Sequence, residues 1–486
     1  MTRVAVLTPL PPSRTGIAHY ASMLVPALAK ELDVAAFASL DGYRRADFDR
    51  VVYQLGNNPH HEWIYEEALR EPGIIVLHDL VLHHLIVEMT LARGDAEGYV
   101  ATLARSHGEA GAAWARGRAA GLHSEMGNFL LPASIDIAQH SRGVIVHNHY
   151  AAERLRSFGV TTPIHVVPHP YIATGELLPP APPHTIGFFG FLTSAKRAEV
   201  VLEAFAIARR REPRLQLLIV GEPAPNIDIS QLLGEGVTAT GYVDDDAFGA
   251  YYAKVDRLVN LRYPSAGETS GTLIRAFDAG KPVAVSNYAQ FAEFPDHCVV
   301  KVPLGEGEVD ALVEFFLRDF DAAAVARAQR AWLESNATLE KCVAGYRAAL
   351  DQWEQGGAQP SHLSYSSHSS HRVLPSGAVA LFPHLTVVST AVTSDTLTLT
   401  LRNDGTTTLR TRSYGEPGYR LLVKLFDGDV VVQDRWLELP GDVAPEGIIE
   451  VTLRVDPRAK TLRLYHALES IPMLEPEPWS EVALVR

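Results

Sequence analysis

The stretch that decides the fold is Ile186-Gly187-Phe188-Phe189-Gly190-Phe191-Leu192-Thr193-Ser194-Ala195-Lys196-Arg197. It begins with a short, mostly apolar run that is typical of a buried strand, and a helical pattern, Ala198–Arg209, follows it. Gly190 therefore marks the turn after a strand, and Lys196 and Arg197 stand beside a helix start. This edge of an open sheet with helices on both faces is where ligands bind.

The same alternation of strand and helix extends from this stretch in both directions. Because short β-branched runs alternate with helical patterns, the sequence predicts parallel sheets built from βα units. A proline-rich stretch, 178–183, separates two such series, so we expect two doubly wound lobes with a ligand between the carboxyl ends of their strands. The predicted strands are Val4–Leu7, Val34–Phe37, Val51–Leu55, Ile74–Leu77 and Val144–His147, then Ile186–Phe189, Leu215–Val220, Thr238–Thr240, Arg257–Leu261 and Val283–Ser286.

A different pattern follows the helical region that ends near Trp353. Residues 356–375 are rich in Gly, Ser and His, a composition typical of a flexible linker. Beyond them, segments that alternate apolar and polar residues are separated by turn sequences, which predicts a small antiparallel β-sandwich. The predicted domains are an N-terminal lobe at 1–178, a second lobe at 179–355, the linker at 356–375 and an all-β domain at 376–486.

Composition narrows the classes of protein that the chain could be. Its 486 residues are too many for one hydrophobic core, and 47% hydrophobic with 21% charged residues is ordinary globular composition. No apolar run reaches the roughly 18 residues that span a bilayer, and the short apolar start reads as a strand, so we expect a cytoplasmic protein. The net charge of −14 argues against nucleic-acid binding. Cys298 and Cys342 lack metal-ligand spacing and are expected to be buried thiols.

Gly16 lies where the first strand turns into a helix, within Pro11-Pro12-Ser13-Arg14-Thr15-Gly16-Ile17-Ala18-His19-Tyr20. A glycine at such a turn lets the backbone approach a phosphate, and the helix N-terminus adds N–H donors and positive potential. The alternative is that the glycine only serves the geometry of the turn.

Cations and a carboxylate mark two strand ends of the second lobe. Lys196 and Arg197 could hold a diphosphate between them, or they could form a solvated basic pair. The segment 263–283 contains a glycine-rich turn, a helix that starts near Thr269, and Gly280 and Pro282 to stop it. Glu268 at the helix entrance could cap the helix or accept hydrogen bonds from sugar hydroxyls.

These three segments, in this order and spacing, resemble GT-B glycosyltransferases of family 4 over residues 1 to about 350. Gly16 is similar to the family's loop at the donor diphosphate, and Gly190 through Lys196 is similar to its phosphate-binding segment. Glu268, followed by Gly271, fits the first of two signature glutamates, which faces the donor sugar. His78, at the end of Ile75-Val76-Leu77-His78-Asp79, is similar to the family's strand-end histidine near that sugar.

The sequence departs from the family pattern at two positions. Phe191 stands where the family places an arginine, and Arg197 could supply the missing charge. Arg275 stands at the place of the second glutamate, one residue short in spacing, so carboxylate recognition of the ribose does not carry over. Arg275 could contact a phosphate or turn outward. Asp244–Asp246 contains Asp-x-Asp, but its place before the helix 247–254 is better explained by capping.

The resemblance assigns a site and an activity. Its catalytic residues would be His78, Lys196 and Glu268, although a strand-end histidine can instead satisfy backbone groups. Its donor-binding residues would be Gly16, Gly190, Arg197, Gly241, Tyr242, Val243, Gly267, Thr269, Ser270, Gly271 and Arg275. The implied reaction is retaining transfer of a sugar from a nucleotide-diphosphate donor to a saccharide or lipid-linked acceptor, without metal or cofactor, in surface polysaccharide or glycoconjugate synthesis.

Several alternatives remain open at this point. The chain could be a non-catalytic GT-B-like protein that binds sugars or polysaccharides, or a nucleotide-sugar epimerase or phosphorylase on the same architecture. Trp436 and Trp479 could stack on sugar rings or belong to the core of the β-domain. That domain could also mediate homo-oligomerisation. The segment Ala101–Asn128 could face the acceptor or a membrane surface, or form a solvated helical pair.

Overall fold

A computed structural model describes the chain in two compact units. The first comprises residues 1–80, 137–156 and 160–361, and the second comprises 81–136, 157–159 and 362–486. The described residues are 2–13, 15–121, 125–171, 184–224, 234–305, 307–353, 385–393, 396–404, 419–428, 430–438, 443–444, 446–468, 471–472 and 480–484. The predicted linker at 356–375 and the proline-rich stretch at 178–183 lie outside them.

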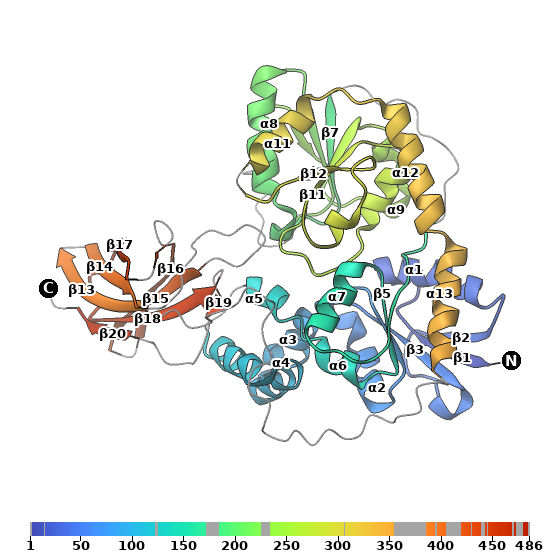
Figure 1. Cartoon of the computed structure of the whole chain (residues 1–486), viewed down its shortest axis with the longest axis horizontal. Coiled ribbons are helices and arrows are strands. Elements are labelled where there is room, and N and C mark those ends of the chain that lie inside the picture. Colours follow the sequence, from blue (N-terminus) through green and yellow to red (C-terminus); the bar gives the residue numbers. More distant parts are fainter. Residues whose placement is uncertain are drawn as a thin grey trace. The chain divides into compact units, whose positions relative to one another are not determined.

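The N-terminal lobe of the first unit is built on a six-stranded parallel sheet (Figure 1). Strand order reverses between β1 and β3, which creates a switch point at their carboxyl ends. The strands, in spatial order, are β2 (Asp33–Phe37), β1 (Arg3–Leu7), β3 (Arg50–Leu55), β4 (Ile74–Leu77), β5 (Gly143–Val146) and β6 (Ile164–Val166). Helices α1 (Gly16–Leu28), α2 (Glu62–Arg70), α6 (Ile135–His140) and α7 (His149–Ser157) connect them.

The second lobe repeats this plan with another six-stranded parallel sheet. Its order is β12 (Val300–Val302), β11 (Val283–Ser286), β10 (Arg257–Asn260), β7 (Thr185–Phe189), β8 (Gln216–Val220) and β9 (Val237–Ala239). The switch point therefore lies between β7 and β10. The two parallel sheets confirm the predicted doubly wound lobes.

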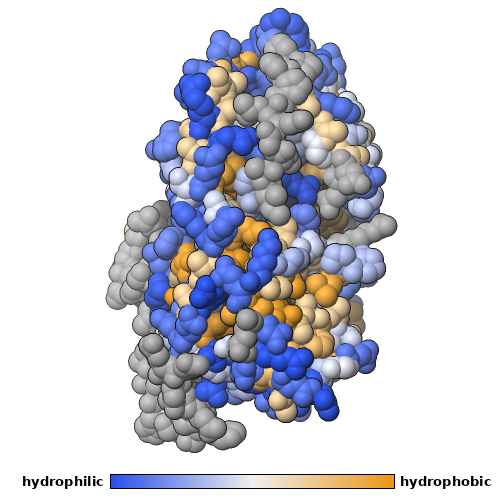
Figure 2. Space-filling view, turned by 90° about the vertical axis from the view of Figure 1, so that its right-hand side faces the viewer, coloured by the Kyte–Doolittle hydropathy of each residue, from blue (hydrophilic) through white to orange (hydrophobic). Residues whose placement is uncertain are grey.

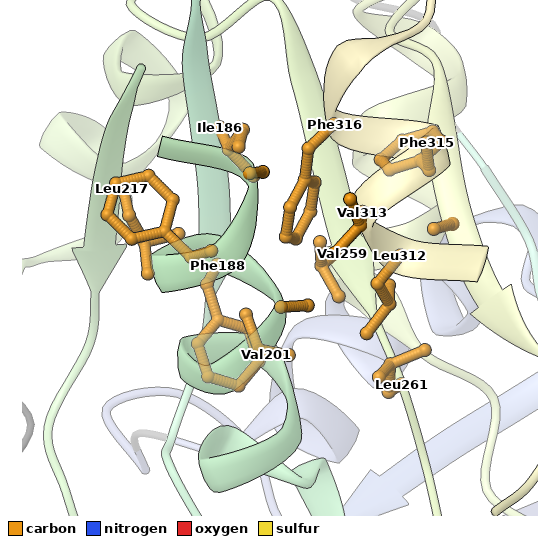
Figure 3. Packing of buried hydrophobic residues seen from close by; sticks show 14 of the residues in the cluster. Ile186, Phe188, Val201, Leu217, Val259, Leu261, Leu312, Val313, Phe315 and Phe316 are labelled. Atoms are coloured by element: carbon orange, nitrogen blue, oxygen red, sulfur yellow. The ribbon is translucent and has the colours of Figure 1, made fainter. Parts of the chain in front are cut away.

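Helices cover both faces of the second sheet. Figure 3 shows α8 (Ala198–Arg211) and α11 (Glu308–Leu317) packing their apolar side chains against Phe188 and Val259. The other face carries a second buried cluster, which includes α9 (Asp245–Tyr252), α10 (Gly271–Asp278) and α12 (Ala322–Asn336). Each fully buried side chain of this size contributes about 1.5–3 kcal/mol, so the sheet is held rigidly beneath the loops at its carboxyl edge.

Helix α13 (Leu339–Gln352) differs from the sequence-based domain division, which groups it with the second lobe (179–355). Its buried residues Cys342, Val343 and Tyr346 belong to the core of the N-terminal lobe. The chain thus returns to the first lobe after α12, and the returning segment pairs with the outgoing one, because Tyr171 N donates to Ala337 O at 2.8 Å. A helical pattern shows which face of a helix is apolar but not which core that face packs against.

On the face of the molecule that Figure 2 shows, hydrophobic residues gather mainly in the lower half.

The second unit contains a helical part and an all-β part. Helices α3 (His83–Met89), α4 (Ala96–Ala119) and α5 (Glu125–Leu130) form the first, and α4 buries Tyr99 and Trp114, so it is not solvated on every side. The strands are β13 (Leu385–Thr393), β14 (Thr396–Asn403), β15 (Tyr419–Asp427), β16 (Val430–Glu438), β17 (Ile448–Arg454), β18 (Thr461–Leu468), β19 (Ile471–Pro472) and β20 (Ser480–Ala483). They form antiparallel sheets β13-β14-β17 and β16-β15-β18-β19, with β20 beside β18. This confirms the predicted all-β C-terminal region.

Three further expectations can be placed on this fold. Within the ranges described above, no helix is long and apolar enough to cross a membrane. Cys298 and Cys342 are buried free thiols, as the sequence predicts. The side chain of Trp436 and the whole of Trp479 lie outside the described residues.

Candidate functional site

Lys196 is buried at the carboxyl end of β7. Gly190 turns the chain there with a φ of +94°, and a Cβ on Gly190 would lie 2.5 Å from Lys196 Nζ. Nζ donates a hydrogen bond to Phe189 O at 2.6 Å. Burial lowers the pKa of Lys196 well below its usual value, Arg262 lowers it further, and Glu268 opposes both. Among the described residues no ion pair joins Lys196 to a carboxylate, so the Phe189 carbonyl is its hydrogen-bond partner and its charge is not neutralised.

Arg262 and Glu268 meet Lys196 at the switch point. Arg262 follows β10, and its Nε donates to Glu268 Oε1 at 2.7 Å. Ser265 Oγ donates to the other carboxylate oxygen of Glu268 at 3.3 Å. The sequence reasoning missed Arg262. The available signal was an arginine close after an apolar strand, at the carboxyl edge of the sheet to which the sequence also assigns Lys196.

Ser270, rather than Glu268, caps helix α10. Its Oγ accepts a hydrogen bond from Leu273 N at 3.3 Å, so the cap alternative for Glu268 does not hold. Ser270 Oγ and Thr272 Oγ1 both donate to Asn260 Oδ1, at 3.2 and 3.1 Å. Asn260 Nδ2 is buried and has no hydrogen-bond partner among the described residues. An unpaired buried amide is costly and points to a missing acceptor.

Arg197 forms an ion pair with the carboxylate of Glu308. Its Nε and Nη2 donate to Glu308 Oε1 and Oε2, at 2.6 and 2.5 Å. Arg197 has a left-handed φ of 58° at the N-terminus of α8, which turns its side chain toward α11. Arg197 is therefore already ion-paired in this structure, and its contact with a diphosphate stays a prediction. Arg262 is the arginine that the fold brings to Lys196.

Arg275 and the loop 241–243 lie beside one another on the second lobe. The Arg275 guanidinium carbon lies 5.5 Å from the ring centre of Phe248 on α9, so the side chain packs on that helix instead of turning outward. Gly241 has a φ of +68° and pairs with Gly221. Tyr242 is 60% exposed, and Val243 packs against the buried cluster that contains Phe248.

Two smaller expectations concern helix starts. Asp244 Oδ1 accepts a hydrogen bond from Ala247 N at 2.8 Å, which confirms the capping interpretation of the acidic run. Gly16 opens α1, where Thr15 Oγ1 accepts from Ala18 N at 3.1 Å. A Cβ on Gly16 would meet nothing within 4 Å, and its φ is not positive. Turn geometry therefore does not demand a glycine at this position.

His78 sits inside a network of buried rings. Its Nε2 lies 3.1 Å from Gln54 Oε1, and its Nδ1 lies 3.3 Å from His147 Nε2. Tyr20 packs edge-on against it, with ring centres 4.6 Å apart. Burial, and then His147 and the other nearby histidines, lower the pKa of His78 well below its usual value. Both ring nitrogens are occupied, which favours the structural alternative for this residue.

The two lobes touch at Gly267. Gly267 has a φ of +76°, and a Cβ there would lie 2.7 Å from Leu80 Cβ of the first lobe. Asn148 Nδ2, also from the first lobe, donates to Gly267 O at 2.9 Å. Leu80 follows Asp79 and Gly267 precedes Glu268, so the contact brings these two carboxyl groups toward one another. Asp79 is the second residue that the sequence reasoning missed.

A cavity of about 600 Å³ adjoins this contact. Thr269 and Ser270 line it from the second lobe, and Asn148 and His169 line it from the first. Neither Gly190 nor Lys196 borders it. The cavity therefore lies next to the cation cluster rather than on it.

Comparison with known proteins assigns part of the chain to a family. Residues 183–321 match the family described as glycosyl transferases group 1. This segment contains Gly190, Lys196, Arg262, Glu268 and Arg275. A search of curated proteins finds no match.

Two solved structures resemble the chain, and the first of them supports its architecture. Sucrose-phosphate synthase from Thermosynechococcus elongatus is similar with a TM-score of 0.50 and 14% identity, over 73% of this chain and all (100%) of that one. HepE from Anabaena, in complex with UDP and glucose, gives a TM-score of 0.48 and 14% identity, over 72% of this chain and 100% of that one. Identity this low is informative about the fold alone. The chain therefore has the two-lobed GT-B fold, and its residues 183–321 match the glycosyl transferases group 1 family, which together support a glycosyltransferase.

Proposed function

We propose that the chain transfers a sugar from a nucleotide-diphosphate donor to a saccharide or lipid-linked acceptor. The observation that carries this proposal is the buried ammonium of Lys196, which has no carboxylate partner among the described residues. Burying a charge without a counter-charge costs free energy, and a bound anion removes that cost. A diphosphate is such an anion, and it supplies the negative charge that keeps Lys196 protonated.

The remaining groups at the switch point suit a diphosphate. Arg262 adds a second cation, the unpaired NH₂ of Asn260 offers a donor, and α10 presents the positive end of its dipole. A Cβ on Gly16 would meet nothing within 4 Å, so the backbone there is open to close approach, and the missing Cβ of Gly190 leaves room for the Lys196 ammonium. During transfer, the bond between the anomeric carbon and the diphosphate breaks and its electrons stay on the phosphate oxygen. Donors fixed in advance stabilise that growing charge.

Glu268 is the proposed contact of the sugar hydroxyls. Arg262 and Ser265 hold its carboxylate in place, so it can accept hydrogen bonds without reorienting. We also propose, from the family resemblance, that the transfer retains anomeric configuration and needs no metal. Arg275 and the loop 241–243 are the proposed neighbours of the nucleoside. Surface polysaccharide or glycoconjugate synthesis, with a possible peripheral membrane contact or a homo-oligomer, remains the proposed setting.

A second function, binding of sugars without transfer, is favoured by two observations. Arg275 replaces a family carboxylate, and both ring nitrogens of His78 are engaged inside the protein. A binding protein would retain a nucleotide or saccharide without consuming it. Product analysis therefore separates the two proposals.

The experiment has two stages. In the first, UDP, GDP, ADP and dTDP are added separately and the melting temperature is measured, because a ligand that binds only the folded state raises it. In the second, the matching nucleotide sugars, UDP-glucose, GDP-mannose, ADP-glucose and dTDP-glucose, are incubated with glucosides and with a lipid-linked sugar. We expect one nucleotide to raise the melting temperature and its sugar to be transferred. Stabilisation without turnover would favour the binding protein, and no response to any nucleotide would reject the donor site.

A further inference from the structure

Asp79 supplies a carboxyl group that the proposed transfer does not yet use. It is the second residue after β4 (Ile74–Leu77), at the carboxyl edge of the first sheet. Its Oδ2 accepts a hydrogen bond from Asn57 N at 2.8 Å, which fixes the carboxyl group in one orientation. Within the part of the chain that the structure describes, its other oxygen takes part in no hydrogen bond. One oxygen is thus anchored and the other is available.

The contact between the lobes places Asp79 at the site of the proposed chemistry. Gly267 packs directly on Leu80, and Asn148 fixes the Gly267 carbonyl. Asp79 consequently faces Glu268 and Arg262, both of which act on it electrostatically. Asp79 therefore lies near Glu268, the proposed sugar contact.

The neighbouring groups are already engaged by other side chains. Both ring nitrogens of His78 are occupied, one near Gln54 and one near His147. The two oxygens of the Glu268 carboxylate accept hydrogen bonds from Arg262 and Ser265. Of the carboxyl groups that meet at Gly267, only that of Asp79 has an oxygen free of a cation and of a hydrogen bond among the described residues.

We propose that Asp79 is a catalytic residue that accepts the proton of the acceptor hydroxyl. The acceptor oxygen forms a bond to the anomeric carbon on the same face from which the diphosphate departs, the bond from that carbon to the diphosphate breaks, and its electron pair leaves with the diphosphate. The hydroxyl proton moves to the carboxylate of Asp79 and then to solvent. This inference rests on the proposed sugar transfer, and it gives the proton a destination other than the departing phosphate.

The electrostatics of Asp79 suit this role. Burial, and then Glu268, raise its pKa to about 7 against the lowering effects of the Asn57 N–H and of Arg262. The titratable residues on its own side, His61 and His78, have pKa values lowered by burial and are neutral. A base is most effective when its pKa lies near the operating pH, because it is then both available and strong enough.

The kinetic test compares pH profiles of kcat/KM for the nucleotide sugar found active in the panel above. Wild-type activity should rise with pH and level off above about 7. Asp79→Asn keeps an oxygen for the Asn57 N–H but cannot take a proton, so the rate should fall about 100- to 10,000-fold and the rise near pH 7 should vanish. Glu268→Gln removes the neighbouring negative charge, so any remaining activity should level off at a lower pH.

Asp49→Asn is the matched control. Asp49 Oδ2 also accepts a backbone hydrogen bond, from Arg3 N at 2.8 Å, and the residue is exposed away from the cleft. This variant should keep the wild-type rate and pH profile. If Asp79→Asn behaves like Asp49→Asn, the departing diphosphate alone accepts the proton and the proposal is overturned.

A second measurement does not depend on activity. When the pKa of a carboxyl is higher in the folded than in the unfolded protein, the free energy of unfolding falls as pH rises from about 4 to 7. The melting temperature of Asp79→Asn should therefore exceed that of the wild type by a few degrees at pH 8, with a smaller difference at pH 5. A difference that does not change with pH overturns the assignment. Lack of transfer by the wild type with every donor would instead reject the proposed function.

Discussion

The two sheets end at the same cleft, yet the chemistry at their carboxyl edges is opposite. The first lobe presents buried rings whose protonation is suppressed, since burial lowers the pKa of His147 to about 4 and that of His169 to about 3. The second lobe presents the cations Lys196 and Arg262. Two copies of one architecture thus have a neutral wall in the first lobe and, in the second, a wall of basic residues that we propose binds an anion and call the anion-binding wall. The difference arises from partners, because the histidines bind one another and the backbone whereas Lys196 lacks a carboxylate partner among the described residues.

The largest expected effect comes from removing the ammonium of Lys196, which has no carboxylate partner among the described residues. Lys196→Met should lower nucleotide-sugar turnover about 100- to 1,000-fold or more and abolish stabilisation by the nucleotide. The melting temperature at neutral pH should rise, because a lysine whose folded pKa is lowered costs stability below its unfolded pKa.

Lys281→Met is the control for that substitution. Lys281 is as buried as Lys196, at 6% against 5% exposure, and burial also lowers its pKa. We expect it to keep both turnover and the nucleotide response. Equal losses in both variants would mean that any buried lysine of this lobe matters, and the anion-binding wall would lose its support.

The two arginines of the second lobe separate binding from stability. Arg262→Met should raise the dissociation constant for the nucleotide about tenfold or more, because a diphosphate contact is removed. Arg197→Met should instead lower the free energy of unfolding by about 3–5 kcal/mol, since it leaves the buried Glu308 unpaired. Urea unfolding and nucleotide titration of both variants measure the two effects. If Arg197→Met weakened nucleotide binding and Arg262→Met lowered stability instead, Arg197 rather than Arg262 would be the diphosphate contact.

The neutral wall predicts a response to acid. The folded pKa of His147 lies below its unfolded value, so unfolding takes up a proton and stability falls as pH drops from about 6.5 to 4. This one group contributes about 3 kcal/mol of that loss. His147→Gln should therefore have a smaller drop in melting temperature between pH 7 and pH 5 than the wild type. An unchanged drop would show that His147 is not the titrating group.

The smallest effect concerns the first helix. Gly16→Ala meets no protein atom within 4 Å and needs no unusual backbone angle, so its melting temperature should equal that of the wild type. If the backbone approaches a diphosphate there, KM for the donor should rise several-fold through steric contact. An unchanged KM would confine the donor site to the second lobe.

Local patterns predicted much of this molecule. Both parallel sheets, the all-β C-terminal region and the strand-end positions of Lys196 and Glu268 follow from alternation and turn residues, which act over short sequence distances. The choice between Arg197 and Arg262 depends on Glu308, which lies 111 residues beyond Arg197. Likewise, the proton affinity of Asp79 depends on Glu268 in the other lobe. Such pairings arise from packing, so no periodicity encodes them.

The return of the chain through α13 also determines how the lobes can move. The polypeptide passes between them twice, and the two passages are bonded to one another at Tyr171 and Ala337. Two joined strands resist twisting more than a single strand does, yet they still bend. In mechanical terms the bonded pair is a shared pivot, because any movement of the second lobe relative to the first has to displace both passages at Tyr171 and Ala337.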